Sequence, residues 1–600
     1  KFLFASYKFV VKHSKMFFLF SLAAVQAASA VVFEYEFTGK DADGYTTPYL
    51  SGDGWALTGR EPWTDDDGVE HGSWTPVYTS EKPTSSDFVA FTPESVIVDG
   101  QYTFRGLLTP GSGAVDMEIR MEDENSVYTD QSLTIDVKYD ESQGQTADMD
   151  GSAYRAITLR QYNKDGSMTI RNGTLNLTKS DAVGQNTLQI DLYSNSDRRS
   201  DSGQIFKKHF ILDTEATMNT TENLLVRGMR ADDVNYSTYH QAGTLLASDG
   251  TADTPYKNVN FTNVDVSFAD TAVLTAKDLT FSGANVTLNP NAQLYVYRTY
   301  VGSGSNLTVA EGTDVKSGTL VVNEGGYAEI NGTYRVERFS QFGDKYEDGT
   351  YKYAHVDDIV VNGGGLLRIG SSGKVMASVS EGGKDFYSDV NINNNAKMII
   401  EDGGQIITSR HLRMAGNAQL VLNGSNSILL EEGGKSSDSL IWLWSGTQRI
   451  EFYADNAIKG FCFAPRTTPD ATGTTVLTVV IGENCNLLDL GTLTATTDGF
   501  GGYLTDGCTL VFEGFKNDTV RITGLREGSI DSKTGVYSED NLANIKAEGY
   551  EDGSFHLEFV NGVDGSDGYW LNAVAVPEPA EIAAALGALA LGIAVLRRRK

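Results

Sequence analysis

The chain has 600 residues and a formal net charge of −31 at pH 7, with 63 glycines and only 12 prolines. A chain of this length is too long to fold around one ordinary compact core, which favours either several domains or one elongated repeat domain. With 27 Phe, 28 Tyr and 6 Trp the sequence has the aromatic content of a folded core, which excludes a disordered low-complexity chain. The acidic charge also argues against a nucleic-acid partner, because its phosphates would be repelled.

The N-terminal segment, residues 1–30, has the three parts of an export signal. A lysine-rich start precedes the apolar run Met16–Ala24, and Ala28 and Ala30 form a small-x-small cleavage site. The predicted mature chain therefore begins at Val31, and the protein is expected at the cell envelope or outer surface. A helix packed into a core is the alternative reading of this segment.

The C-terminal segment, residues 576–600, also has three parts in order. A Pro-Glu-Pro motif comes first, the apolar run Ile582–Leu596 follows, and a basic cluster ends the segment. The motif and cluster residues are Pro577, Glu578, Pro579, Arg597, Arg598, Arg599 and Lys600. The run is short for a bilayer span, which needs about 17–25 residues, but with the arginine stems it can just cross. We expect a single apolar helix that anchors the protein with its basic end in the cytoplasm; a plain anchor without sorting is the alternative.

This three-part arrangement resembles the PEP-CTERM sorting signal of Gram-negative bacteria, and the resemblance covers only residues 576–600. In that family an exosortase recognises the Pro-Glu-Pro motif and processes the protein at the membrane. The resemblance therefore implies an exosortase-type partner for Pro577, Glu578 and Pro579. It implies a sorting route and no particular activity.

Between the two ends, short segments alternate apolar and polar residues, which is the pattern of half-buried strands. Asn-Gly, Gly-Gly, Asp-Gly and Glu-Gly pairs separate these segments and supply the positive φ angles of turns. Clear examples of predicted strands are Val259–Thr262, Val264–Phe268, Val286–Leu288 and Leu307–Val309.

The turns recur with a period. The motif Asn-Ala-Gln/Lys-Leu/Met begins at Asn291, Asn395 and Asn417, and the last two copies lie 22 residues apart. Three cysteines are too few and too sparse for a disulfide framework. Cys462, Cys485 and Cys508 are each separated by 23 residues, which predicts that they share one inward position in successive coils. Short strands and Gly or Asn turns at this period predict a parallel β-helix.

The predicted fold class is therefore all-β: a right-handed parallel β-helix (solenoid) with a β-rich N-terminal cap or sandwich and one apolar C-terminal helix. Leu320–Ile330 and Ile359–Ile369 resemble passengers of bacterial autotransporters and related adhesins. Caps would protect the open ends from edge pairing, with Tyr569, Trp570 and Leu571 as an apolar plug. The expected segments are 1–30 (signal peptide), 31–160 (N-terminal cap), 161–530 (solenoid), 531–575 (C-terminal cap) and 576–600 (sorting segment).

Acidic clusters are the main candidates for metal binding. Asp65, Asp66 and Asp67, with Glu70 and His71 nearby, are compatible with a Ca²⁺ site or with a solvated turn. None of the acidic glycine turns continues to the spaced glutamate of an EF-hand loop, and the His and Cys residues lack zinc-ligand spacing. We therefore assign no metal ligand and no catalytic residue. Similar acidic turns begin at Asp41, Asp148 and Asp564.

Exposed aromatic residues are the candidates for binding a sugar, because an indole ring can stack on the apolar face of a pyranose. Trp55, Trp63 and Trp74 are weak candidates, with packing in the core of the cap as the alternative. Trp442 and Trp444 lie two residues apart on a predicted strand, so they share one face. The single Thr-x-Thr row Thr492–Thr496 does not make the flat face of an ice binder.

The expected function is that of an exported structural or adhesive surface protein, which contacts extracellular polysaccharide or other cells through many weak interactions. The first alternative is a polysaccharide lyase or hydrolase on the same scaffold, which needs two carboxylates about 5–10 Å apart. A carbohydrate- or ice-binding module is the second alternative. Neighbouring acidic and basic residues that fit the enzyme alternative are Arg335, Glu337, Arg338, Lys352, Asp357 and Asp358.

Overall fold

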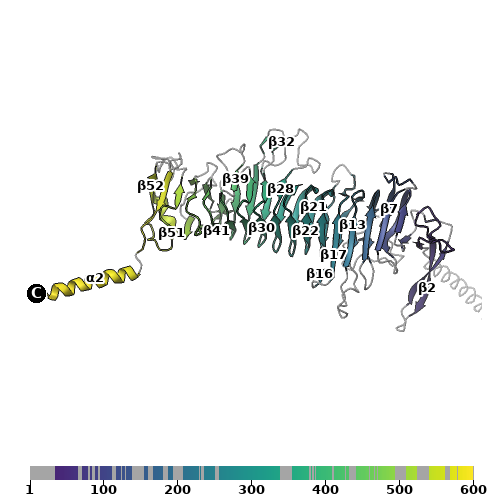
Figure 1. Cartoon of the computed structure of the whole chain (residues 1–600), viewed down its shortest axis with the longest axis horizontal. Helices are drawn as coiled ribbons and strands as arrows, with labels where there is room; N and C mark the ends of the chain where they lie inside the picture. The colour runs from purple at the N-terminus through teal and green to yellow at the C-terminus, as the bar shows by residue number, and fades with distance from the viewer. Residues whose placement is uncertain are drawn as a thin grey trace, which may run out of the picture. The chain divides into compact units, whose positions relative to one another are not determined.

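The computed structural model consists mainly of strands that stack in parallel as successive coils of a β-helix, and one helix follows them (Figure 1). It contains two compact units: unit 1 is Lys1–Val266 with Thr271–Ala276, and unit 2 is Ser267–Asp270 with Lys277–Lys600. The predicted all-β parallel β-helix is confirmed. The structure describes residues 34–64, 70–78, 82–83, 88–91, 95–110, 116–122, 125–128, 130–137, 154–159, 166–179, 187–192, 207–228, 230–231, 235–250, 256–337, 355–377, 380–381, 384–385, 387–408, 411–425, 428–430, 441–458, 460–464, 466–468, 471–493, 508–522, 539–560, 568–576 and 579–598.

Between residues 306 and 444 each coil of unit 2 places one strand in each of three rows, and strands of one row pair in parallel with those of the coils before and after. We call these rows 1, 2 and 3 in the order in which a coil visits them. Strand β23 (Gln293–Val301) is long enough to pair in rows 2 and 3. Row 1 contains β22 (Asn285–Leu288), β24 (Asn306–Val309), β27 (Tyr327–Ile330), β30 (Leu366–Ile369), β35 (Lys397–Ile400), β38 (Gln419–Leu422), β41 (Gly446–Phe452), β46 (Thr475–Ile481), β49 (Cys508–Glu513) and β51 (Ile545–Ala547).

Rows 2 and 3 complete each coil. Row 2 contains β25 (Asp314–Ser317), β28 (Thr333–Val336), β31 (Lys374–Ala377), β36 (Gln405–Thr408) and β39 (Ile428–Leu430). Row 3 contains β26 (Thr319–Val322), β29 (His355–Val361), β34 (Tyr387–Ile392), β37 (Leu412–Met414), β40 (Ile441–Trp444), β43 (Gly460–Ala464) and β48 (Thr492–Leu493).

Unit 1 has the same three-row coil. Row 1 contains β5 (Ser95–Val98), β7 (Asp116–Met121), β10 (Gly166–Arg171), β13 (Lys207–Leu212) and β17 (Asn235–Gln241). Row 2 contains β6 (Gln101–Pro110), β8 (Ser132–Asp136), β11 (Thr174–Thr178), β14 (Thr217–Thr220) and β18 (Thr244–Ala247). Row 3 contains β9 (Tyr154–Thr158), β12 (Thr187–Asp191), β15 (Asn223–Arg227) and β19 (Val259–Thr262). Strands β20 (Asp265–Phe268) and β21 (Val273–Ser282) contain residues of both units.

Alternating side chains explain why these segments become strands of a solenoid. In β24 the side chains of Leu307 and Val309 are buried while Asn306 is exposed, because successive side chains of a strand point to opposite faces. Register then stacks the inward residues of row 1 into a continuous apolar column, and each member is at most 1% exposed. The column in unit 2 is Val286, Leu307, Ala328, Leu367, Met398, Leu420, Ile450 and Val479.

Asparagines stack at the bends between rows. The amide Nδ2 of Asn362 donates to Oδ1 of Asn323 (3.1 Å), and Nδ2 of Asn393 donates to Oδ1 of Asn362 (3.0 Å). Asn395 has a positive φ of 60°, as predicted for its turn, and accepts from Nδ2 of Asn417 at 3.1 Å. The 22-residue spacing of that motif therefore does correspond to one coil. Insertions between strands make the other coils longer.

Replacement of Asn362 by alanine is expected to lower the free energy of unfolding by about 1–3 kcal/mol, because it removes two amide hydrogen bonds at a half-buried turn. Asn417→Ala, which removes one bond between exposed side chains, is the matched control and should cost less than about 1 kcal/mol. Urea unfolding followed by circular dichroism measures both. Equal effects of the two substitutions would contradict a stabilising role of the stacked asparagines.

Antiparallel strands lie at both ends of the described β structure. In unit 1, β1 (Glu34–Phe37) pairs in parallel with β4 (Phe88–Phe91) and antiparallel with β2 (Trp55–Thr64), which forms a hairpin with β3 (Glu70–Tyr78). Parallel pairing thus already includes strands of the expected cap, residues 31–160. Short antiparallel strands elsewhere are β16 (Arg230–Ala231), β32 (Ser380–Glu381), β33 (Lys384–Asp385), β44 (Arg466–Thr468) and β45 (Ala471–Thr472).

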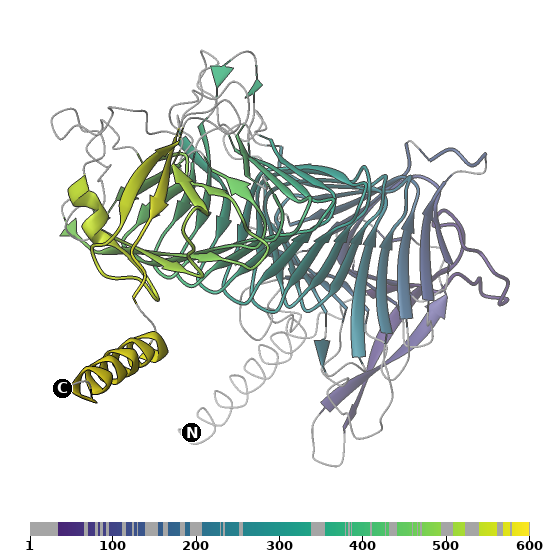
Figure 2. The same ribbon diagram turned by 60° about the vertical axis from the view of Figure 1, so that its left-hand side comes forward.

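At the C-terminal end of unit 2, β53 (Gly568–Asn572) pairs antiparallel with both β50 (Val520–Ile522) and β52 (His556–Val560) (Figure 2). Tyr569 and Leu571 of β53 are buried, as expected for the plug. Two shorter strands belong to the same sheet: β42 (Asn456–Ala457) pairs in parallel with β47 (Leu488–Asp489), and β47 pairs in parallel with β50. The 3₁₀ helix η5 (Glu539–Asn544) precedes β51, and the helix α2 (Pro579–Arg598) follows β53.

The expected cysteine column is wrong. Cys462 lies in β43 of row 3, Cys485 lies in the turn after β46, and Cys508 begins β49 of row 1. All three are buried and free of disulfides. Insertions of unequal length separate the strands of successive coils, so an equal spacing in the sequence does not return to the same position in the coil.

Candidate functional site

Of the aromatic candidates of the N-terminal region, Trp55 lies in the core of unit 1. Trp55 is 1% exposed, its Nε1 donates to the carbonyl oxygen of Leu50 at 2.9 Å, and its ring packs 4.9 Å from that of Phe37. Trp55 therefore offers no open face to a sugar. The backbones of Trp63 and Trp74 belong to the β2–β3 hairpin, and their side chains lie outside the described residues.

The C-terminal segment forms a helix with uncovered aliphatic side chains. Pro579 begins α2, and Arg597 and Arg598 lie exposed in its last turn. Across the described residues, no helix combines the length and the apolar character needed to cross a membrane. Pro577, Glu578 and Arg599, like Ala28 and Ala30 of the signal segment, lie outside the described residues. The exposed aliphatic residues of α2 are Leu586, Leu589, Leu591, Ile593, Val595 and Leu596.

The acidic turns do not form a metal centre in the part of the chain that is described. There, no group of three or more His, Cys, Asp or Glu side chains could hold a metal ion. Asp41 instead accepts backbone hydrogen bonds from Asp43 (3.0 Å) and Tyr45 (2.9 Å), so its carboxylate stabilises the local turn. The other acidic candidates lie in residues 65–69, 138–153 and 561–567, which are not described.

Of the residues that fit the enzyme alternative, Arg335 and Glu337 have described side chains, and each pairs with a residue of the adjacent coil. Arg335 of β28 pairs with Asp314 of β25 (3.4 Å), and Lys316 of β25 pairs with Glu337 (3.4 Å). These are exposed pairs between adjacent coils of row 2. The side chains of Arg338, Lys352, Asp357 and Asp358 lie outside the described residues, as do those of the Thr492–Thr496 row.

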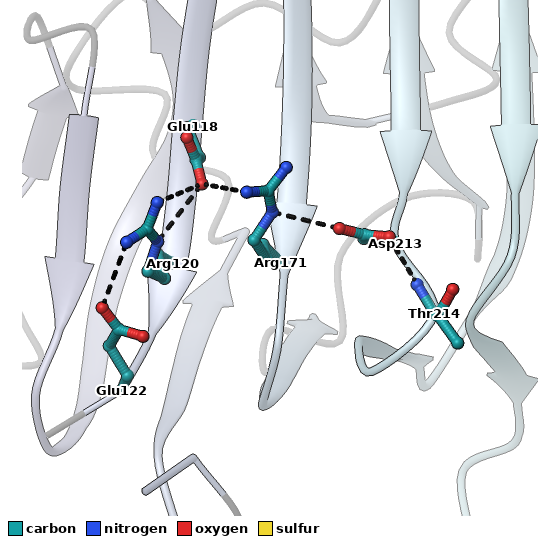
Figure 3. Close-up of polar contacts among 6 residues, drawn as sticks. All are labelled: Glu118, Arg120, Glu122, Arg171, Asp213 and Thr214. Atoms are coloured by element: carbon teal, nitrogen blue, oxygen red, sulfur yellow. Dashed lines mark hydrogen bonds and ion pairs between the residues drawn. The ribbon is translucent and has the colours of Figure 1, made fainter. Parts of the chain in front are cut away.

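Charged side chains on the outer face of row 1 connect neighbouring coils in unit 1. Figure 3 shows Glu118 of β7 between two guanidinium groups: Arg120 at 3.0 Å and Arg171 of β10 at 3.2 Å. Arg171 continues to Asp213 at 3.0 Å. All four are partly exposed, so each pair contributes at most about 1 kcal/mol. Each of these four charged side chains therefore has a partner of opposite charge, on its own strand or on a neighbouring coil. None of the four is an isolated reactive group.

Beside this network, a row of hydroxyl, carboxylate and imidazole groups crosses four strands. Ser167 Oγ donates to Asp116 Oδ1 at 2.6 Å, and Nδ1 of His209 shares a hydrogen bond of 2.7 Å with Thr238 Oγ1. Register places Ser167 between Asp116 and His209. A Ser-His-Asp relay needs the imidazole between the hydroxyl and the carboxylate, so these residues do not form one.

Unit 2 repeats the charge pairing on row 1. Arg368 of β30 contacts Glu329 of β27 (3.1 Å) and Glu401 (2.8 Å), and Nδ2 of Asn423 donates to Glu401 at 2.7 Å. The amide of Asn423 first, and Arg368 second, hold the pKa of Glu401 below its ordinary value. Further along, Arg449 contacts Glu451 and Glu513.

The outer face of row 3 in unit 2 differs from these networks because three of its polar side chains, those of Asp389, Asn391 and His411, are buried. We define the row 3 cluster as five residues: Asp389 and Asn391 of β34, His411 just before β37, Arg413 of β37, and Trp442 of β40. An Arg413 guanidinium nitrogen lies 2.7 Å from Asp389 Oδ2, and the Asp389 side chain is 0% exposed. The rings of His411 and Trp442 lie 4.5 Å apart.

Register explains how the cluster forms. Asn391 pairs with Arg413, Arg413 with Trp442 and Trp442 with Cys462, so these four residues are lateral neighbours on the face away from the core. Sequence reasoning found the shared face of Trp442 and Trp444 but missed the others. They come from strands separated by insertions of different length, and no motif spacing signals their proximity.

Comparison with known proteins adds no assignment: no protein-family model matches this chain, and neither a curated protein nor a solved structure matches it.

Proposed function

We propose that this protein is an exported, non-catalytic structural or adhesive protein of the cell envelope, which presents its β-solenoid to extracellular polysaccharide or to other cells. The supporting observation is that outward charges are paired between coils, as in Glu118–Arg171 of unit 1 and Glu329–Arg368 of unit 2. Such a surface is polar, repetitive and stiff, which suits many weak contacts along a partner. A hydrolase or lyase requires convergent reactive groups, and these pairs are distributed along the coils.

The two ends of the chain provide the route in this proposal. Residues 1–30 direct export, and residues 576–600 direct surface sorting by exosortase-type machinery. The exposed aliphatic side chains of α2, such as Leu589 and Leu591, support contact of this segment with the apolar part of a membrane or of that machinery. Arg597 and Arg598 at its last turn support attraction to anionic lipid headgroups.

Cell fractionation of a Pro577→Ala/Pro579→Ala variant tests the sorting route. The natural chain is expected in the surface or released fraction, and the double variant is expected to accumulate unprocessed in the inner-membrane fraction. Glu581→Gln, which changes one charge close to the motif, is the matched control and should fractionate like the natural chain. Unchanged surface display and release of the double variant would contradict sorting by this motif.

A further inference from the structure

The sheet at the C-terminal end of unit 2 has an open edge. Its strands follow one another in the order β42, β47, β50, β53 and β52. Strand β53 therefore has a partner on both sides, while β52 pairs only with β53 among the strands that the structure describes. An edge strand presents a row of backbone N–H and C=O groups, and a strand of another chain can pair with them.

Strand β52 lacks the features that commonly protect such an edge. Natural edge strands are often blocked by lysine, proline or a bulge. The sequence of β52 is His-Leu-Glu-Phe-Val, and it pairs with β53 in an unbroken antiparallel register. The side chains of His556 and Glu558 are 49% and 56% exposed. The carboxylate of Glu558 opposes a second strand only where that strand places a carboxylate directly opposite.

The sequence of β52 is complementary to itself in one antiparallel register. In a two-fold symmetric pair, residue i of each copy contacts residue j of the other. With the axis at Leu557, His556 of each copy lies opposite Glu558 of the other, and an imidazole N–H can donate to a carboxylate. An axis at Glu558 would instead place two carboxylates opposite each other, which is destabilising. An axis at His556 would leave Glu558 opposite Ser554.

The same register brings apolar side chains together on the second face of the strand. Leu557 and Phe559 are half-buried and alternate with the two polar residues. With the axis at Leu557, each leucine lies opposite its own copy, and Phe559 lies opposite Phe555. Aromatic and aliphatic pairs across neighbouring strands stabilise a sheet. Both faces of the strand therefore favour one and the same register.

The contact that β52 makes within one chain does not compete strongly with this pairing. Nε2 of His556 lies 3.1 Å from Oε1 of Glu558 in the same strand. Because both side chains are about half exposed, this contact contributes little to stability. Its exchange for the same contact between two copies therefore costs little.

We propose that two copies of this chain associate through β52, whose edges pair antiparallel about a two-fold axis at Leu557 and join two five-stranded sheets into one. Each copy contributes one short strand, so the interface is smaller than that of an obligate dimer and the association is reversible. A dimer carries two solenoids, and weak contacts of both with one partner would add. This inference goes beyond the proposed function and requires neither export nor sorting.

Sedimentation equilibrium of the full chain in mild detergent, at about 1–200 μM, tests the association. The natural chain is expected to form a reversible dimer. Glu558→Lys places lysine opposite histidine, and His556→Glu places carboxylates opposite each other, so each variant alone should associate about tenfold more weakly or less. An equimolar mixture of the two variants should form a heterodimer, because the histidine and lysine of one then face two carboxylates of the other. Glu548→Lys, the same change at an exposed residue outside the strand, is the matched control and should dimerise like the natural chain.

Oxidative cross-linking tests the register. In Leu557→Cys the two introduced thiols lie opposite each other on the axis, within reach of a disulfide. In Phe559→Cys they lie four residues apart along the strands, about 13 Å, and should not cross-link. The three natural cysteines are buried, and circular dichroism checks that each variant keeps the β structure of the natural chain.

A natural chain that stays monomeric over the whole concentration range would overturn the proposal. Equal weakening by Glu558→Lys and Glu548→Lys, no heterodimer in the mixture, or equal cross-linking at positions 557 and 559 would do the same. These measurements use purified protein and do not depend on cell fractionation, so failure of the dimer and failure of the surface route are distinguishable.

Discussion

Replacement of Arg413 by methionine is expected to lower the free energy of unfolding by about 3–5 kcal/mol, because it removes the guanidinium from a buried carboxylate. Asp389 is 0% exposed and its Oδ2 lies 2.7 Å from Arg413. Burial of a carboxylate without its cation is among the most costly changes in a protein interior. Similar pairs between adjacent coils join Asp191 to Arg227 (3.5 Å) and Asp489 to Arg521 (3.3 Å).

Urea unfolding together with hydrogen exchange of β34, β37 and β40 measures this loss, since repeat proteins open locally as well as globally. Arg335→Met is the matched control: its pair with Asp314 is solvent-exposed on both sides (33% and 52%) and should contribute at most about 1 kcal/mol. Asp389→Asn combined with Arg413→Met should recover part of the loss. If Arg413→Met and Arg335→Met cost the same, the buried pair does not stabilise this face.

Replacement of Phe261 by alanine is expected to lower the free energy of unfolding of unit 1 by about 3–5 kcal/mol. Phe261 is 0% exposed and its ring lies 4.9 Å from that of Tyr239, which in turn stacks on Phe210 at 5.5 Å. Removal of a fully buried ring that packs against this aromatic pair leaves a cavity that the flanking strands cannot close, because their ladder hydrogen bonds fix the spacing of the coils.

Hydrogen exchange of β15, β17 and β19, with thermal unfolding of the whole chain, measures the effect of Phe261→Ala. Tyr45→Ala is the control, because Tyr45 is 71% exposed and its removal leaves no cavity. Protection of β19 that is unchanged in Phe261→Ala would show that this group of three aromatic rings is not part of the core that holds these coils together.

Much of the fold could be predicted from local patterns. The alternation in Val259–Thr262 and in Leu307–Val309 predicts strands β19 and β24, and the turn at Asn395 has the positive φ that its motif requires. The alternation works because one face of each strand meets the apolar interior of the coil. The cysteine column failed because insertions change the length of each coil.

The candidate site could be predicted only in part. Trp442 and Trp444 share a face because residues two apart on a strand always do. Nothing in the sequence places Asp389 beside Arg413. Their contact depends on the register between two neighbouring coils, and insertions of unequal length hide that register in the sequence. Trp55 is a weak candidate for a sugar platform from the sequence, with the core of the cap as the alternative, and its burial at 1% assigns it to the core.

The sequence by itself determined that this protein is built from short strands and glycine- or asparagine-rich turns, because side-chain alternation and positive φ are properties of neighbouring residues. It also specified the apolar segment that forms α2. Only the tertiary structure decided which side chains of successive coils meet, and therefore where buried charge occurs on the outer face. Lateral contacts in a solenoid are set by register between coils, and register is a property of the packed interior that no single segment contains.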